Sequence, residues 1–319
     1  MLISRSGKSR LVLAQFGRSV FVSDVQWAGN SRLIVALGDQ GALCTIDIRT
    51  REVVALGPVV GGIGNGTCEQ RVGPLSLGAG DRFTVSADGH RVAYVEDSPY
   101  GNRGMEAFAI AVVASGGGAG HTLPEPINAS DTDPSFSPNG SQVVFARSLR
   151  TGALGPPSLM TQSVIGGRAR SLHVEGDDPV WSPNGRWIVF QHRSQQPGRT
   201  NLPDGLGIVS ASGGSPRTLL RTPAGVGLAV SWSPDSKKIA FFTEGKRMGI
   251  ATLSGRVTFF TLGRHAPDIG DSINGLPANA PRWSPDGKTL TFAVITNGPE
   301  LQTRMYSIGA NGRRLLPIE

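Results

Sequence analysis

The chain has 319 residues, of which 39% are hydrophobic, 17% are charged and only 6% are aromatic, and it contains 44 glycines and 22 prolines. This composition suits many short strands joined by tight turns better than long helices, so we expect an all-β fold. No apolar run reaches the roughly 18 residues that a membrane-spanning helix needs. The net charge of +7 comes from scattered basic residues without interleaved aromatic side chains, which argues against nucleic-acid binding.

The N-terminal segment, residues 1–19, precedes the regular part of the sequence. Its stretch LISRSGKSRLVL (2–13) is typical of a strand hairpin, which either adds a strand that closes a ring or is the remnant of a longer precursor. Its longest apolar run, Leu11 to Ala14, is too short for the apolar region of a signal peptide. We therefore expect no export signal in this sequence.

A repeat with a period of about 50 residues fills the rest of the chain. Each copy has a turn sequence close to Ser-Pro-Asp/Asn-Gly, followed by an apolar run. The copies are VQWAGNSRLIVAL (25–37), FTVSADGHRVAYV (83–95), PSFSPNGSQVVFA (134–146), PVWSPNGRWIVFQHR (179–193), VSWSPDSKKIAFF (230–242) and PRWSPDGKTLTFA (281–293). Their turn residues Asn30, Asp88, Asn139, Asn184, Asp235 and Asp286 are separated by 58, 51, 45, 51 and 51 residues.

Each residue of the turn has a conformational reason. Proline presets φ at the first central position, Asp or Asn bonds to the nearby backbone, and glycine takes the left-handed position. The expected structural positions are Pro138, Pro183, Pro234 and Pro285, together with Gly89, Gly140, Gly185 and Gly287. Ser236 stands where other copies have glycine, so we expect a left-handed serine there, at a cost on the order of 1 kcal/mol.

The apolar runs after the turns indicate strands that are covered on both faces. Their apolar residues are consecutive rather than alternating, as in Ile188-Val189-Phe190. Tryptophan recurs just before the turn, and we expect it to pack between neighbouring repeat units rather than to bind a ligand. These tryptophans are Trp27, Trp181, Trp232 and Trp283.

A second hairpin follows in each unit, marked by pairs such as Gly166-Gly167, Gly213-Gly214 and Asn311-Gly312. Each unit is thus four antiparallel strands. Six such units that are covered on both faces predict a six-bladed β-propeller over residues 20–319, with seven blades, one of them partial and N-terminal, as the alternative.

The repeat Trp/Phe-Ser-Pro-Asp/Asn-Gly, as in Trp181 to Gly185 and Trp283 to Gly287, resembles the TolB-like, WD-like propeller repeat from about residue 20 to the C-terminus. The resemblance implies a propeller that serves as an interaction domain for a protein, peptide or glycan. It also implies an extracytoplasmic place, in the periplasm or cell envelope. We expect a monomer.

The long connections, which join the second strand to the third and one blade to the next, are the expected binding face. Asp133 and Asp178 share one repeat position just before the innermost strand, where they either cap a turn or give oxygen atoms to a ligand or a cation such as Ca²⁺ at the channel mouth. The candidate binding residues on this face are Asp133, Asp178, His192, Arg193, His265, Tyr100, Arg147 and Asn279.

Two function classes follow from this face. We favour a non-catalytic binding scaffold, because the chain has no Gly-x-Ser-x-Gly, Gly-x-Gly-x-x-Gly or Walker A pattern. The alternative is a metal-assisted lyase or lactonase, in which His192, His265, Asp133 and Asp178 would have to converge on one metal. Two histidines are few for a transition-metal site, so we expect no metal of that kind.

The two cysteines leave a further choice open. Cys44 lies on a predicted strand face with Ile46 and Ile48, which favours a buried thiol. If the protein acts outside the cytosol, a disulfide between Cys44 and Cys68 would instead stabilise the fold by roughly 3 kcal/mol.

Overall fold

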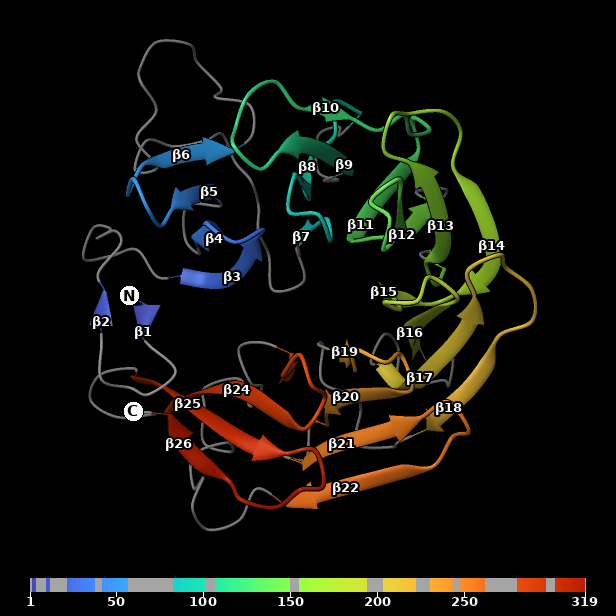
Figure 1. The fold of residues 1–319 in the computed structure, drawn as a ribbon. Coiled ribbons are helices and arrows are strands. Elements are labelled where there is room, and N and C mark those ends of the chain that lie inside the picture. Colours follow the sequence, from blue (N-terminus) through green and yellow to red (C-terminus); the bar gives the residue numbers. More distant parts are fainter. Residues whose placement is uncertain are drawn as a thin grey trace. The chain divides into compact units, whose positions relative to one another are not determined.

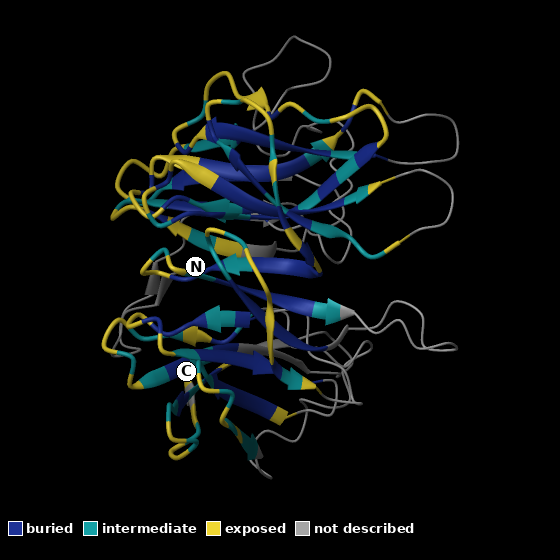
Figure 2. Cartoon of the chain, turned by 90° about the vertical axis from the view of Figure 1, so that its right-hand side faces the viewer, coloured by how far each residue is buried: buried dark blue, intermediate teal, exposed yellow. Residues whose placement is uncertain are grey.

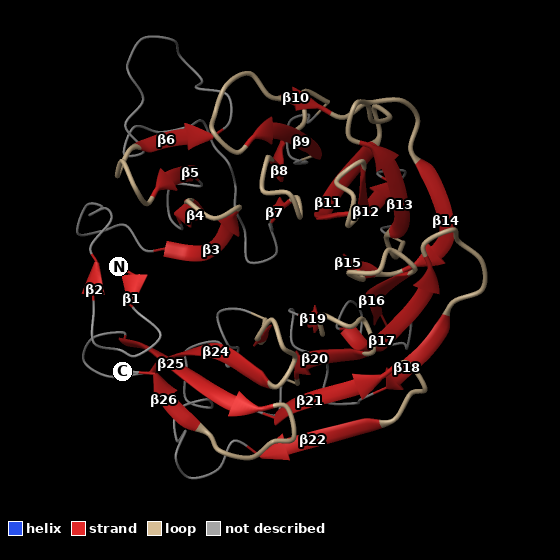
Figure 3. Cartoon of the chain, in the orientation of Figure 1, coloured by secondary structure: helices blue, strands red, loops and turns tan. Residues whose placement is uncertain are grey.

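The structure is a computed structural model. It describes residues 2–3, 10–11, 22–37, 42–56, 83–100, 107–149, 155–193, 203–221, 230–243, 247–261, 280–296 and 302–318. Every regular element within these ranges is a β-strand (Figure 3), so the expected all-β class is confirmed. In this part of the chain no helix is long and apolar enough to cross a membrane.

The strands form six four-stranded antiparallel sheets arranged as a β-propeller, which confirms the six-bladed prediction. Each sheet is a meander in which strands consecutive in sequence are hydrogen-bonded neighbours (Figure 1). The chain divides into two compact units, residues 1–172 and 173–319. Blades 1 and 2 lie in the first unit and blades 5 and 6 in the second, while the boundary falls within the last strand of blade 3.

The strands of the first three blades have the following bounds. Blade 1 consists of β3 (Val22–Ala28), β4 (Arg32–Leu37), β5 (Ala42–Asp47) and β6 (Val53–Leu56). Blade 2 consists of β7 (Thr84–Val85), β8 (Arg91–Asp97), β9 (Phe108–Ala114) and β10 (His121–Thr122). Blade 3 consists of β11 (Ala129–Phe136), β12 (Gln142–Leu149), β13 (Ser158–Ser163) and β14 (Arg170–Glu175).

The remaining blades repeat the same order. Blade 4 consists of β15 (Asp177–Trp181), β16 (Trp187–Arg193), β17 (Pro203–Ser210) and β18 (Arg217–Arg221). Blade 5 consists of β19 (Val230–Trp232), β20 (Lys238–Phe242), β21 (Arg247–Thr252) and β22 (Val257–Thr261). Blade 6 consists of β23 (Arg282–Trp283), β24 (Thr289–Thr296), β25 (Gln302–Gly309) and β26 (Leu316–Ile318).

The serine of the Ser-Pro-Asp/Asn-Gly turn organises the first hairpin of a blade. In blade 3, Ser137 Oγ donates to Asn139 Oδ1 at 2.8 Å and accepts from the backbone N–H of Gln142 at 3.0 Å. The turn closes with the N–H of Gly140 donating to the carbonyl of Ser137 at 2.8 Å. The same pattern recurs from Ser86, Ser182, Ser233 and Ser284. The serine hydroxyl thus bonds both to the Asp or Asn side chain of the turn and to a backbone N–H group, which the turn would otherwise leave unpaired.

The predicted left-handed backbone at the last turn position is confirmed both in the copies with glycine and in the copy with serine. Gly89, Gly140, Gly185 and Gly287 have φ between 66° and 74°, and Ser236 has φ 59°. Ser236 is buried, and its Oγ accepts the backbone N–H of Asn184, in the turn of the preceding blade, at 3.0 Å. This bond between two turns offsets part of the strain that a side chain causes in this conformation.

The second strand of each blade carries the core. Phe145, Phe190, Phe241 and Phe292 stand at equivalent positions and are buried. Figure 2 shows that buried residues run along the strands of the sheets. In blades 4 and 5 the cross-strand partner is glycine, and a Cβ at Gly207 would lie 2.3 Å from the Phe190 ring. A larger residue there would displace the ring, because a core packed this closely has no free volume. Burial of each ring contributes about 1.5–3 kcal/mol.

The recurring tryptophans link neighbouring blades in the second unit. Trp232 Nε1 donates to the carbonyl of Val180 at 3.0 Å, and Trp283 Nε1 donates to the carbonyl of Ser231 at 3.2 Å. Each indole thus joins its own innermost strand to that of the preceding blade. Trp181 instead donates to the carbonyl of Gly185, in its own turn, at 3.2 Å.

Trp27 departs from this pattern, since 52% of its surface is exposed. It belongs to blade 1, the first four-stranded sheet of the described residues. The repeat position therefore does not guarantee burial of the ring, which depends on the neighbour that the ring can pack against.

The N-terminal segment contains a short hairpin, as expected. β1 (Leu2–Ile3) pairs with β2 (Arg10–Leu11) in a two-stranded sheet of their own. Closure of a ring by this segment stays a prediction. On β5, Cys44 is completely buried, and no cysteine in the described part of the chain is a free thiol. This favours the disulfide, but its expected partner Cys68 lies outside the described residues, so the pairing stays a prediction.

Candidate functional site

Asp133 and Asp178 occupy equivalent positions within the innermost strands, not before them as expected. Asp133 lies inside β11 and Asp178 inside β15, each at a shift of register that marks a β-bulge. Both are buried and have left-handed backbones, with φ 55° and 48°. The prediction of their place was wrong because strand pairing continues beyond the bulge, which absorbs the extra residue.

Asp178 is held by a buried amide from the next strand. Gln191 Nε2, on β16, donates to Asp178 Oδ2 at 2.7 Å, and both side chains are buried. His192, the next residue of β16, is half-buried. Arg193 ends the strand, and its side chain is outside the description.

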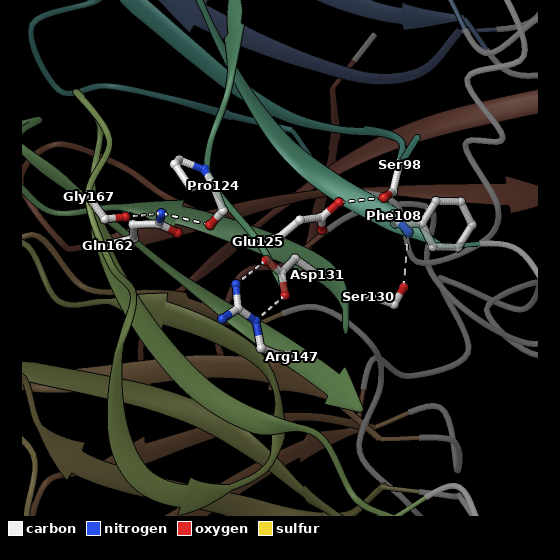
Figure 4. A network of polar contacts seen from close by, with 9 residues as sticks. All are labelled: Ser98, Phe108, Pro124, Glu125, Ser130, Asp131, Arg147, Gln162 and Gly167. Carbon is white, nitrogen blue, oxygen red and sulfur yellow. Dashed lines mark hydrogen bonds and ion pairs between the residues drawn. The ribbon is translucent and has the colours of Figure 1, made fainter. Parts of the chain in front are cut away.

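Arg147 forms a bidentate ion pair in the first unit. Its Nε and one terminal nitrogen each donate to a carboxylate oxygen of Asp131 at 2.6 Å, and both residues are buried (Figure 4). Asp131 on β11 is the strand partner of Arg147 on β12, so the register itself brings the two side chains together. The pKa of the Asp131 carboxyl is raised, because the effect of burial is larger than the opposing effect of the hydrogen bonds and charge of Arg147.

Glu125 joins two connections beside this pair. It lies in the connection between blades 2 and 3, and Ser98, which follows β8, donates its hydroxyl to Glu125 Oε1 (Figure 4). The other oxygen, Oε2, is buried and has no hydrogen-bond partner in the structure. Burial raises the pKa of Glu125 to about 7, and the nearby Asp131 charge adds to this, while the Ser98 bond and the Arg147 charge oppose it.

The start of the connection that carries Glu125 is held by a glutamine from β13. Gln162 Nε2 donates to the carbonyl of Pro124 at 3.0 Å and to that of Gly167 at 2.7 Å (Figure 4). Ser130, at the far end of the connection, accepts the backbone N–H of Phe108 at 3.1 Å. The connection is therefore held at both ends and in the middle, so Glu125 has a fixed place.

Sequence reasoning missed Glu125, Asp131 and Gln162. The available signal was the segment Pro124-Glu125-Pro126, in which two fixed φ angles hold a carboxylate next to a buried strand. Such a segment presents its central side chain in few orientations.

Three exposed apolar side chains are carried by segments in or next to the Glu125 cluster. Tyr100, Ile127 and Leu149 are 43%, 71% and 52% exposed. The backbone N–H of Tyr100 donates to Ser98 Oγ at 3.1 Å, Ile127 follows Glu125 by two residues, and Leu149 is the strand partner of Ala129. These three residues, here named the apolar triad, are thus carried by segments that hydrogen bonds connect.

The structure describes only part of the expected set of binding residues. His265 and Asn279 lie outside the described residues. Within the described ranges, no three or more His, Cys, Asp or Glu side chains form a group that could hold a metal ion. Of the sequence-predicted set, Arg147 and Tyr100 belong to segments of the cluster in the first unit, and Asp178 and His192 belong to blade 4 in the second unit.

Neither a protein-family model nor a curated protein sequence matches the chain, but many solved structures share its fold. A structure of oligogalacturonate lyase in complex with manganese has a TM-score of 0.60 at 14% identity, over 91% of this chain and 75% of that chain. The nidogen/laminin complex has a TM-score of 0.57 at 11% identity, over 90% of this chain and 92% of that chain. TolB from Acinetobacter baumannii has a TM-score of 0.50 at 16% identity, over 92% of this chain and 78% of that chain.

At these identities the likenesses concern the fold, and propellers with this fold carry different functions. The six meandering blades, the Ser-Pro-Asp/Asn-Gly turns and the similarity to TolB agree with one another. The chain is a six-bladed β-propeller with a TolB-like fold.

Proposed function

We propose that the chain is a non-catalytic scaffold that binds a protein or peptide partner through the apolar triad of Tyr100, Ile127 and Leu149. The observation that carries this proposal is the exposure of the three side chains on segments that are otherwise held in place. Exposed apolar side chains on a fixed backbone lose little conformational entropy when a partner covers them. Because hydrogen bonds connect the segments that carry them, we treat the three side chains as one exposed apolar surface, a feature that marks interaction sites.

The polar cluster on these segments sets the character of the partner. The Glu96 charge acts on Glu125, and Asp131 is neutralised by Arg147. A segment with aliphatic or aromatic side chains and a hydrogen-bond donor or a basic group complements this surface. The aliphatic side chains of Ile127 and Leu149 offer a glycan no hydrogen bonds, so we favour a protein or peptide. The nidogen/laminin structure is a complex of proteins, which supports such a role for the fold.

Peptide selection on the immobilised protein tests the proposal. Peptides selected against the wild type should bind the Tyr100→Ser/Ile127→Ser/Leu149→Ser variant at least about tenfold more weakly, because truncation of central apolar contacts removes most of the binding energy. The control is Ile165→Ser, which removes an apolar side chain that is 86% exposed from the turn between β13 and β14. Equal affinity of the wild type and the triple variant for every selected peptide would refute the proposed surface.

A metal-assisted lyase is the second candidate, favoured by the similarity to the manganese-bound oligogalacturonate lyase. It requires His192, His265, Asp133 and Asp178 to act together. Incubation of the protein with oligogalacturonate and Mn²⁺, followed by ultraviolet detection of unsaturated products, decides between the candidates. Product formation that is lost in His192→Ala would replace the scaffold proposal with the enzyme.

The proposed place of action is extracytoplasmic, as the TolB-like fold suggests. Fractionation of cells that express the protein from its natural gene tests this. Recovery in the soluble cytoplasmic fraction alone would contradict it.

A further inference from the structure

Gln191 breaks the apolar pattern of the second strand. The equivalent positions of the other five blades hold Leu37, Val95, Ala146, Phe242 and Ala293. Gln191 nevertheless has 0% of its surface exposed. A buried amide destabilises a fold unless its polar atoms are bonded, so a polar residue at this position needs a specific reason.

The amide of Gln191 is only half satisfied. Its Nε2 donates to Asp178 Oδ2 at 2.7 Å, and this bond fixes the orientation of the amide because a carboxylate only accepts. Gln191 Oε1 is then buried without any hydrogen-bond partner. An unsatisfied buried acceptor destabilises the fold, and a donor or a cation at this oxygen would offset that cost.

Two carboxylates lie on the same face of the sheet as this oxygen. Asp177 is the strand partner of Gln191, so the two side chains point to the same side of blade 4. The bulge after Asp177 turns the next residue, Asp178, toward the same amide. Both aspartates are buried. Three oxygen-bearing side chains thus lie on one face of blade 4 at the start of β15.

The chemistry of these groups points to a small cation. The donor Nε2 is used by Asp178, so the unpartnered atom of the amide is an acceptor oxygen, and the two neighbouring side chains are carboxylates. A carboxylate accepts several bonds at once, so a cation adds to the other contacts of Asp177 and Asp178. The depth of burial favours an ion over a larger organic cation. Carboxylate and amide oxygens are the ligands that Ca²⁺ prefers.

We propose that Asp177, Asp178 and Gln191 contribute oxygen ligands to a calcium ion bound at the start of β15 in blade 4. Water or backbone carbonyl oxygens complete the coordination, as is usual for Ca²⁺. The ion joins β15 to β16 and stabilises the left-handed backbone of Asp178. This site lies in the second unit and is independent of the partner surface proposed for the apolar triad.

Calcium titration of the chelator-treated full chain tests the site. Calorimetry should show one binding event with a dissociation constant at or below about 1 mM, and Ca²⁺ should raise the midpoint of thermal unfolding. Asp178→Asn removes the charge but keeps a residue that tolerates the left-handed region. Gln191→Leu replaces the amide with a side chain found at the equivalent position of blade 1. Each variant should weaken Ca²⁺ binding on the order of tenfold or more.

Gln162→Leu is the matched control. Gln162 is also buried with an unpartnered Oε1, but its amide donates to two backbone carbonyls and to no carboxylate. Its variant should bind Ca²⁺ as the wild type does. Absence of both a binding heat and a thermal shift in the wild type would overturn the proposal and assign Gln191 Oε1 to a buried water. Wild-type affinity in folded Asp178→Asn, checked by circular dichroism, would also overturn it.

Discussion

The Asp131 carboxylate accepts two hydrogen bonds of 2.6 Å from the Arg147 guanidinium, and both side chains are buried in blade 3. The guanidinium carbon also lies 5.2 Å from the centre of the Phe145 ring on the same strand. A buried ion pair of this geometry is stable only while both partners are present. It holds β11 to β12 directly beside the connection that carries Glu125.

Removal of one partner of this pair should destabilise the protein strongly. Arg147→Met leaves the Asp131 carboxylate buried without its bidentate partner, so we expect a loss of about 3 kcal/mol or more in the free energy of unfolding. The double variant Asp131→Leu/Arg147→Met removes both charges of the pair. Its free energy of unfolding should therefore fall by less than that of Arg147→Met. Urea unfolding of the single and double variants gives the coupling free energy between the two side chains. Additive losses would show that the two side chains do not act as a pair.

The raised pKa of Glu125 predicts a pH dependence of stability. The folded protein holds the Glu125 proton up to about pH 7, and the unfolded chain releases it near the ordinary value of 4.5. Its stabilising contribution is therefore complete below about pH 4.5 and is lost as the pH rises through about 7. Glu125→Gln mimics the protonated form and should flatten this decline. The side chain is half-buried, so solvent screening reduces the effect to the order of 1 kcal/mol.

Thermal unfolding at pH 5 and pH 8 measures this effect. The difference between the two midpoints should be smaller in Glu125→Gln than in the wild type. Glu52→Gln, at an exposed position of blade 1, should leave the difference unchanged. An identical pH dependence in wild type and Glu125→Gln would refute the assigned protonation.

The contribution of the indole hydrogen bond between blades 4 and 5 to stability can be measured separately from that of ring packing. Trp232→Phe keeps most of the ring but loses the bond to the Val180 carbonyl, so we expect a loss of about 1 kcal/mol. Trp232→Ala also leaves a cavity and should cost about 3–5 kcal/mol. Trp27→Phe, at the half-exposed position, should change the free energy of unfolding by less than about 0.5 kcal/mol. Denaturant unfolding compares the three; equal losses at Trp27 and Trp232 would contradict the assigned role.

Ser236 combines backbone strain with a useful hydroxyl. Ser236→Ala loses the bond to the Asn184 N–H and keeps the strain, whereas Ser236→Gly loses the same bond and relieves the strain. Ser236→Gly should therefore be more stable than Ser236→Ala by about 1 kcal/mol. Thermal unfolding ranks the two variants, and the reverse order would show that the turn is not strained.

The repeat made the fold predictable from sequence. The turn chemistry of Pro183, Asn184 and Gly185, written with small changes along the chain, fixes one hairpin per blade, and consecutive apolar residues require cover on both faces. Even the left-handed Ser236 followed from its alignment with glycine. These features are local, so a single sequence contains them.

The candidate site was predicted less well because it depends on contacts between segments distant in sequence. Ser98 and Glu125 are separated by 27 residues, and Arg147 and Asp131 by 16. Arg147 was singled out as a loop-face residue, yet its buried partner depends on the strand register, which the sequence pattern did not specify. The bulges at Asp133 and Asp178 likewise arise from pairing beyond the expected strand ends.

Hydrogen–deuterium exchange with a selected peptide tests the partner surface most directly. The account predicts slower exchange on binding in residues 96–100 and 124–130, the segments that carry Tyr100 and Ile127, with no change in the turn at Ile165. Slower exchange confined to that turn, or to the Ser-Pro-Asp/Asn-Gly turns, would contradict it.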